Sequence, residues 1–359
     1  MRRLRRALYA VAAHGWTTLR YRSKVWRLQR RLVRTDVAVS RSNAKRFWRR
    51  HLGVSISTRW HFVYAQQSGR DDERYVPEDV FYWQIEPTLN VHDLFRAYAD
   101  KNLYGRWLPE DVLPEAVLRC VHGRYYGRDF QRVDPASALR EGEQYVIKPS
   151  LLSGGGRQVE LLTVEAGKPR VGHASFGWDQ LQALYQGNLI VQKPLQQHPD
   201  IAAMNASSIN TVRIMTLNLG KPTVLSSVIR VGRAGSLVDN MTSGGAVVCG
   251  IRQDGRLNSW ATDYYDNRVF VHTDNGYRFD GQEVPGINAA RELVLGLHQR
   301  LFYFDLASWD VAIDPQCRPT LVEVNLRGQE ISFHQVNNGP LFGEHTEEVL
   351  HHVRSRSRG

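Results

Sequence analysis

The 359-residue sequence lacks the features that mark several common protein classes. No uninterrupted apolar run approaches the ~20 residues of a membrane-spanning helix, so no transmembrane segment is predicted. The three cysteines, Cys120, Cys249 and Cys317, have no motif spacing, which favours buried thiols in a reducing compartment over a disulfide framework or a zinc site. The Walker P-loop, G-x-G-x-x-G and G-x-S-x-G motifs are also missing, which narrows the classes of enzyme to consider.

Acidic residues are nearly absent from residues 1–50, which we call the leader. It holds 16 Lys and Arg against one acid, Asp36, for a net charge of +15, whereas residues 51–359 carry a net charge of −4. Apolar side chains such as Trp26 and Trp48 are interleaved with the arginines at roughly helical spacing. Helices docked on the body would explain this pattern, and so would contact with an anionic membrane or glycan; nucleic acid is the least favoured partner. We expect a cytoplasmic protein that the leader can hold at the inner face of a membrane.

The rest of the sequence predicts a mixture of helices and antiparallel hairpins rather than regular βαβ alternation. A helical pattern interrupted by prolines covers residues 80–118, and short strands, a glycine-rich loop and a helix follow. The expected strands are 145–149, 158–164, 188–192, 211–219, 223–231, 306–313 and 319–324, and the expected later helices are 178–185 and 289–303. The predicted fold class is α+β.

A group of oxygen-bearing side chains is expected on the last hairpin. Glu323 and Asn325 are two residues apart on one predicted strand, so they point to the same face, and Asp310 lies on the partner strand. Apolar residues flank all three, and a buried acid pair needs a cation or a donor. Oxygen ligands in this number suit Mg²⁺ that also binds substrate phosphates. A solvent-exposed strand face would explain the same alternation.

A second candidate site follows the strand that ends in Val146-Ile147-Lys148-Pro149. The segment Ser153-Gly154-Gly155-Gly156 comes directly behind it. A lysine supplies a point charge, and a glycine loop supplies backbone N–H groups that can close over phosphates. An ordinary turn between two strands would have the same composition.

The order of these segments resembles the ATP-grasp superfamily, most closely its sugar-transfer-associated group. A lysine precedes a glycine-rich hairpin, a strand ends in Val191-Gln192-Lys193-Pro194-Leu195, and Asp310, Glu323 and Asn325 follow. The resemblance covers about residues 80–350 and implies a nucleotide held between two subdomains that contain antiparallel sheets. With it we divide the chain into a basic helical extension, the N-terminal part of the body, the glycine-loop subdomain and the C-terminal subdomain, at residues 1–75, 76–143, 144–195 and 196–359.

The resemblance also assigns roles to residues. Lys101 and Lys148 would hold the α- and β-phosphates of ATP, and Ser153, Gly154, Gly155 and Gly156 would form the loop over them. Backbone groups of Lys193 and Leu195 and the side chain of Gln192 would bind adenine, and Asp200 the ribose. Asp310, Glu323 and Asn325 would bind the metal, expected to be two Mg²⁺ ions.

The activity implied is a ligase that joins a carboxylate-bearing substrate to an amine through an acyl phosphate, in the modification of a polysaccharide or a carboxylated sugar. Arg213, Arg230 and Arg327 are the candidates to stabilise negative charge during both steps. Two departures from the family pattern make the acceptor pocket unlike that of a dipeptide ligase. Ser308 stands where many relatives have Arg, and Leu326-Arg327-Gly328-Gln329 replaces a Pro-Gly turn. An ATP-grasp phosphotransferase and a non-catalytic ATP-binding component of glycan assembly are the alternatives.

Overall fold

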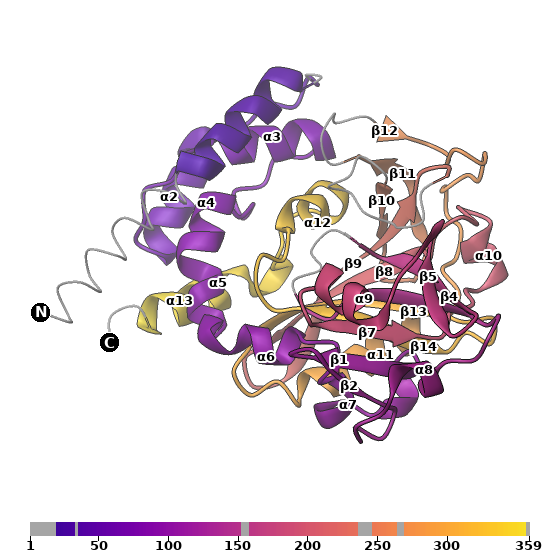
Figure 1. The fold of residues 1–359 in the computed structure, drawn as a ribbon. Helices are drawn as coiled ribbons and strands as arrows, with labels where there is room; N and C mark the ends of the chain where they lie inside the picture. The colour runs from indigo at the N-terminus through magenta and orange to yellow at the C-terminus, as the bar shows by residue number, and fades with distance from the viewer. Residues whose placement is uncertain (1–18, 33–34, 152–157, 236–245, 264–268, 357–359) are drawn as a thin grey trace, which may run out of the picture.

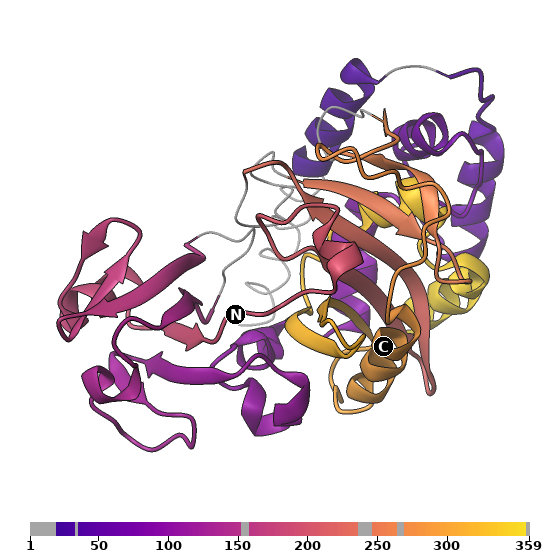
Figure 2. The same cartoon turned by 90° about the vertical axis from the view of Figure 1, so that its right-hand side faces the viewer.

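The chain folds around two antiparallel sheets of seven strands each. The structure is a computed structural model, and it describes residues 19–32, 35–151, 158–235, 246–263 and 269–356. The two sheets lie in separate lobes, which Figure 2 shows side by side, with the first sheet in magenta and the second in orange and brown. Helices gather almost entirely on the second lobe (Figure 1).

The first lobe spans residues 116–192, and its strands run in the order β2-β1-β7-β3-β4-β5-β6. Buried side chains on one face of the sheet, including Leu118, Ile147 and Val191, pack against α9. The elements are β1 (Ala116–Val121), β2 (Arg124–Tyr126), α8 (Pro135–Ala138), β3 (Gln144–Pro149), β4 (Glu160–Glu165), β5 (Lys168–Val171), β6 (Ala174–Ser175), α9 (Trp178–Leu184) and β7 (Leu189–Gln192).

The second sheet has the strand order β12-β11-β10-β9-β8-β13-β14. Strand β13 is buried along its whole length and β8 along all but its last residue, because helices cover both faces. Successive side chains of a strand point to opposite faces, so the consecutive residues Ile214 and Met215 belong to different hydrophobic clusters. The elements are α10 (Pro199–Ala202), β8 (Thr211–Asn218), β9 (Pro222–Gly232), β10 (Ala246–Ile251), β11 (Leu257–Thr262), β12 (Val269–Phe270), α11 (Ile287–His298), β13 (Leu306–Ile313) and β14 (Pro319–Asn325).

The two faces of the second sheet have different coverings. Helix α11 packs Ala290 and Val294 against the face that carries Ile214 and Trp309. Helices from both ends of the chain cover the face that carries Met215. These helices are α2 (Arg41–His51), α4 (Glu78–Val80), the π-helical turn η1 (Phe81–Ile85), α5 (Glu86–Leu89), α12 (Ile331–Asn338) and α13 (Thr346–Arg356). Helix α3 (Arg59–Ser68) packs on α12, while α6 (Phe95–Ala99) and α7 (Tyr104–Trp107) lead to the first lobe.

The described part of the leader is packed onto the second lobe. Residues 19–31 form a helix in which Val25 is fully buried in a cluster with Trp60 and Tyr64 of α3. Lys24 on the same helix donates to both carboxylate oxygens of the buried Glu78 at 2.8 Å. Helix α2 buries Trp48 against α13. The docked arrangement that the sequence left open is therefore present in the described residues of the leader.

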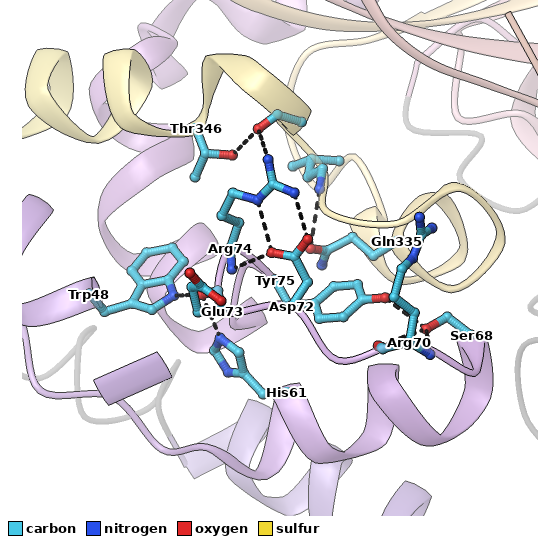
Figure 3. A network of polar contacts seen from close by, with 12 residues as sticks. Trp48, His61, Ser68, Arg70, Asp72, Glu73, Arg74, Tyr75, Gln335 and Thr346 are labelled. Carbon is cyan, nitrogen blue, oxygen red and sulfur yellow. Dashed lines mark hydrogen bonds and ion pairs between the residues drawn. The ribbon is translucent and has the colours of Figure 1, made fainter. Parts of the chain in front are cut away.

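The charged segment that follows α3, predicted as a domain boundary, is a hydrogen-bonded junction (Figure 3). Arg74 pairs with Asp72 at 2.6 Å, and the Glu73 carbonyl accepts from Trp48 at 3.0 Å. The Gln335 side chain of α12 accepts from the N–H of Val76 at 2.7 Å and donates to its carbonyl at 3.0 Å. This segment therefore joins the leader helices to the C-terminal helices instead of separating two units.

Most predicted strands are found within one or two residues of their expected bounds, and the α+β fold class is confirmed. Two differences stand out: residues 116–118, expected at the end of a helical region, begin strand β1, and no strand was expected at β2, β5, β6, β10, β11 or β12. Strands β1 and β2 join the sheet of the segment 144–195, so the structure unites parts of the chain that the sequence division separated at residue 144. In the described parts of the chain, no helix has the length and apolar content to cross a membrane.

Candidate active site

Two lysines and a glutamate meet where the two lobes approach each other. Lys148 lies on β3 of the first lobe, and Lys101 lies in the turn after α6, where its N–H donates to the carbonyl of Ser150 at 3.0 Å. The Lys101 ammonium donates to Glu323 of β14 at 2.7 Å. Both lysines are buried, with exposed fractions of 4% for Lys101 and 7% for Lys148. Residues far apart in the sequence thus form one charged cluster.

The electrostatics of this cluster favour an added anion. Burial and the neighbouring Lys101 lower the pKa of Lys148 to about 8, and Glu323 only partly opposes them. The ammonium form of Lys148 is thus disfavoured by its surroundings, and added negative charge would favour it. A polyphosphate would supply that charge and would restore the ordinary pKa of Lys148.

Asp310 is held by arginines from two adjacent strands. It lies opposite Arg213 in the β13–β8 register, and Arg213 donates to its two carboxylate oxygens at 2.6 and 2.7 Å. Arg230 of β9 is 3.3 Å from the same carboxylate, and Asn325 donates to it at 3.3 Å. Burial would raise the pKa of Asp310, but the attraction of Arg213 and Arg230 holds it at about 2. The carboxylate is therefore ionised near neutral pH.

The oxygen-bearing residues of the last hairpin lie on adjacent strands, and the two carboxylates among them already have cationic partners. Asp310 and Glu323 are register partners across β13 and β14, and Asn325 lies two residues beyond Glu323. In the described residues no group of three or more His, Cys, Asp or Glu gathers as a metal site. Carboxylate and amide oxygens are ligand types that Mg²⁺ accepts, and a cation here would share Asp310 with Arg213 and Arg230 and Glu323 with Lys101.

The expected adenine segment begins at the end of β7. Its Gln192 side chain is buried and donates to the Pro114 carbonyl at 3.4 Å. The backbone N–H of Lys193 donates to the Glu115 carbonyl at 2.9 Å. Leu195 is partly buried just beyond it. The segment therefore lies at the connection between the lobes, as expected.

Other predicted residues lie apart from the charged cluster. Arg327 is exposed and lies over the ring of Phe95 at 5.3 Å. Asp200 is exposed in the first turn of α10, where its carboxylate lies 3.8 Å from His198. Ser153, Gly154, Gly155 and Gly156 lie outside the described residues. Of the three arginines proposed for catalysis, the structure brings Arg213 and Arg230 together at Asp310, and it places Arg327 elsewhere.

The structure adds Glu330 and His334, which sequence reasoning missed. Glu330 precedes α12 with φ +55°, a conformation that costs energy for a residue with a side chain, and its carboxylate is 3.6 Å from Arg213. His334 is buried one turn along, and its Nδ1 lies 2.9 Å from the Ser226 hydroxyl. Burial and the nearby arginines lower its pKa to about 3, so its imidazole is neutral. The unusual loop after Asn325 was the available signal for Glu330.

A comparison of the sequence with protein-family models identifies the family of this chain. The family model described as sugar-transfer associated ATP-grasp matches residues 82–350. A comparison with curated proteins finds no match. Solved structures that resemble the chain include a D-alanine–D-alanine ligase from Bacillus anthracis, with 11% identity over 72% of this chain and 68% of that one and a TM-score of 0.36.

Two further similar structures are ligases. An L-amino acid ligase from Bacillus licheniformis has 14% identity over 72% of this chain and 49% of that one, with a TM-score of 0.36. The ATP-grasp ligase PsnB, solved with a phosphomimetic variant of a minimal precursor, Mg and ADP, has 12% identity, coverage of 72% and 59%, and a TM-score of 0.38. The chain thus spans about half to two thirds of the length of these structures. On the family match, which covers most of its length, this chain belongs to the sugar-transfer associated ATP-grasp family.

Proposed function

We propose that the protein is an ATP-dependent ligase that joins a carboxylate to an amine through an acyl-phosphate intermediate. The observation that carries the proposal is the meeting of opposite charges between the lobes. Lys101 and Lys148 lie beside Glu323, and Asp310 with its two arginines lies across the same hairpin. Such a site can bind a nucleoside triphosphate and a second anion next to it.

In this proposal ATP lies between the lobes. Lys101 and Lys148 bind its α- and β-phosphates, since both are buried cations of one cluster and the lowered pKa of Lys148 indicates that its ammonium would be stabilised by added negative charge. The backbone beyond β7 binds adenine, and the segment from Ser153 to Gly156 covers the phosphates. Asp310, Glu323 and Asn325 would hold Mg²⁺, which would neutralise phosphate charge when bound.

The chemistry proceeds in two balanced steps. A carboxylate oxygen of the substrate forms a bond to the γ-phosphorus, and the bond from that phosphorus to ADP breaks. The amine then attacks the acyl carbon, inorganic phosphate leaves, and the amine loses a proton. Negative charge develops at the phosphoryl group in the first step and at the acyl oxygen in the second. Arg213 and Arg230 are fixed cations at the Asp310 end of the proposed site, so they can stabilise the negative charge of both steps without rearrangement.

The substrate class is proposed from the family. Its description names sugar transfer, which supports a carboxylated sugar or its glycan as one of the two substrates. The departures at Ser308 and at Leu326–Gln329 lie beside the metal residues, so a dipeptide ligase's substrates do not transfer to this chain. A cytoplasmic location accords with a reaction that consumes ATP.

The test is a matrix of carboxylate and amine pairs, with ADP and phosphate measured and every product weighed by mass spectrometry. The proposal expects ADP release that needs both partners and a product lighter by one water than their sum. A stable phosphorylated product without need for an amine would show the phosphotransferase. Tight ATP binding without turnover of any pair would instead indicate the non-catalytic component. The Glu323→Ala protein serves as the inactive control.

A further inference from the structure

The leader helix at residues 19–31 has two faces with different roles. Its inward face consists of Tyr21, Lys24, Val25 and Leu28, spaced three and four residues apart as a helix requires. Tyr21 stacks on Tyr82 with ring centroids 4.6 Å apart. This face is fully used in packing, so the opposite face is presented outward.

The outward face combines cations with large apolar side chains. Leu19 is 69% exposed and Trp26 is 44% exposed, although the body of the protein has buried most of its tryptophans' surface. Exposed arginines surround these two residues, and Arg30 lies over the Trp26 ring at 3.5 Å. The exposed arginines of this helix are Arg20, Arg22, Arg27, Arg30 and Arg31.

Helix α2 enlarges the cationic surface at the same end of the second lobe (Figure 1). Its inward face buries Ala44 and Trp48, and its outward face is basic. Neither α2 nor residues 19–31 contains an acidic residue. The exposed cations of α2 are Arg41, Lys45, Arg46, Arg49 and Arg50.

We propose that this surface, the outward faces of residues 19–31 and of α2, docks on an anionic lipid membrane. Arginines bind lipid phosphates, and each contributes about 1 kcal/mol near an anionic leaflet. Trp26 and Leu19 are suited to the zone between headgroups and acyl chains, where tryptophan places its ring and its N–H together. A polyanion without lipid would use the cations but would give the exposed Leu19 no apolar environment.

The proposal assigns one helix to both folding and membrane contact. The first lobe lies on the other side of the molecule from the leader helices, so docking would leave it accessible (Figure 2). The inference needs no particular substrate and is independent of the proposed ligase chemistry.

The experiment is sedimentation of the full chain with phosphatidylcholine vesicles, with or without phosphatidylglycerol. The charge variant is Arg20→Gln with Arg27→Gln and Arg30→Gln. The matched control removes three exposed cations elsewhere, by Arg124→Gln, Lys168→Gln and Arg278→Gln. A third variant, Trp26→Ser, tests the apolar part. Thermal melting checks that each variant is folded, because all the substituted side chains point to solvent.

We expect binding to the anionic vesicles alone, reversed by salt. The charge variant should partition roughly 100-fold more weakly, which corresponds to three cations at about 1 kcal/mol each. Trp26→Ser should also weaken binding, and the control should bind much more tightly than the charge variant. Equal losses in the charge variant and the control would overturn the proposal, because only net charge would matter. Absence of binding, or capture by soluble anionic polysaccharide that is insensitive to Trp26→Ser, would overturn it as well.

Discussion

Ser308 and Gln329 are hydrogen-bonded to each other at 2.9 Å, with both side chains fully buried. They are the sites of the two departures from the family pattern, and the structure shows that the departures are in contact. Gln329 also donates to the Leu306 carbonyl, and the buried Glu86 accepts from the N–H groups of Gly328 and Gln329. The loop after Asn325 is thus held by polar contacts instead of by a Pro-Gly turn.

Restoring the arginine at this position should therefore fail. Ser308→Arg places a long cation in a site without space, next to Gln329, whose contacts are already made. We expect a loss of about 3–5 kcal/mol in the free energy of unfolding and no gain in turnover. Ser308→Ala, which removes one hydrogen bond, should cost only about 1 kcal/mol. Urea denaturation of the two variants measures the difference, and equal stabilities would show that this pocket is looser than described.

The role of Glu323 can be tested by substitution, because its side chain is partly exposed and joins no hydrophobic cluster, although it is the ion-pair partner of the buried Lys101. Glu323→Ala should abolish ADP formation, since it removes a carboxylate proposed to hold Mg²⁺ and the partner of Lys101. Its melting temperature should fall, because the buried Lys101 loses an ion-pair partner, and the melting curve shows whether the variant is still folded at the assay temperature. Glu292→Ala, at an exposed position of α11 on the opposite face of the sheet, is the matched control and should keep full activity. Full turnover by Glu323→Ala with Mg²⁺ as the sole divalent ion would refute the assignment.

Lys148 predicts a pH dependence of nucleotide binding. Its pKa of about 8 lies below the ordinary value, so in the free protein the ammonium form is lost as the pH rises through 8. Bound phosphates would stabilise the ammonium, so binding takes up a proton above that pH. ATP affinity should then fall by up to about 10-fold per pH unit from pH 8 upward. Calorimetry in buffers of different ionisation enthalpy measures the proton uptake.

The companion variants separate this effect from general changes in charge. Lys148→Met should weaken ATP binding by roughly 1.5–3 kcal/mol and remove the proton uptake, as expected for loss of a charge-assisted bond. Lys168→Met lies at an exposed position of the same sheet and should change neither. Unchanged ATP affinity in Lys148→Met would count against the phosphate site.

His298 predicts acid sensitivity of the fold, at a position remote from the charged cluster. It is buried between the Thr216 hydroxyl at 2.7 Å and the Phe304 carbonyl at 3.0 Å, and burial lowers its pKa to about 4. The unfolded chain binds a proton near pH 6.5 and the folded chain does not, so stability present above pH 6.5 is lost as the pH falls toward 4. The loss should reach roughly 3 kcal/mol.

Denaturation at a series of pH values tests this. His298→Gln cannot titrate, so its stability should change less steeply between pH 6.5 and 4 even though it is lower throughout. His173→Gln, at an exposed position of the first lobe, should follow the unaltered protein. Parallel curves for all three proteins would exclude His298 as the source of the acid sensitivity.

Much of the fold could be predicted because the deciding signals were local. The hairpin of β13 and β14 follows from alternation around a turn, and this also placed Asp310 opposite Glu323. Contacts between distant segments could not be predicted in the same way. Arg213 meets Asp310 only because β8 inserts beside β13, and Lys24 meets Glu78 only because the leader folds back. Residues 116–118 were assigned to a helical region, and the rest of β1 and β2 to no element, because prolines and short apolar runs do not distinguish strands from broken helices.

The polypeptide enters and leaves the first lobe at a single place. β1 begins at Ala116 and β7 ends at Gln192, and these two residues are direct neighbours in the sheet. The rest of the polypeptide is already joined to itself, since α2 packs against α13 from the opposite end of the chain. Residues 116–192 therefore form an inserted lobe whose two ends lie together. A short linker between Glu115 and Lys193 could replace this lobe. The rest of the protein should then fold without the first lobe. Whole first lobes could also be exchanged between relatives without changes to the sequence around them.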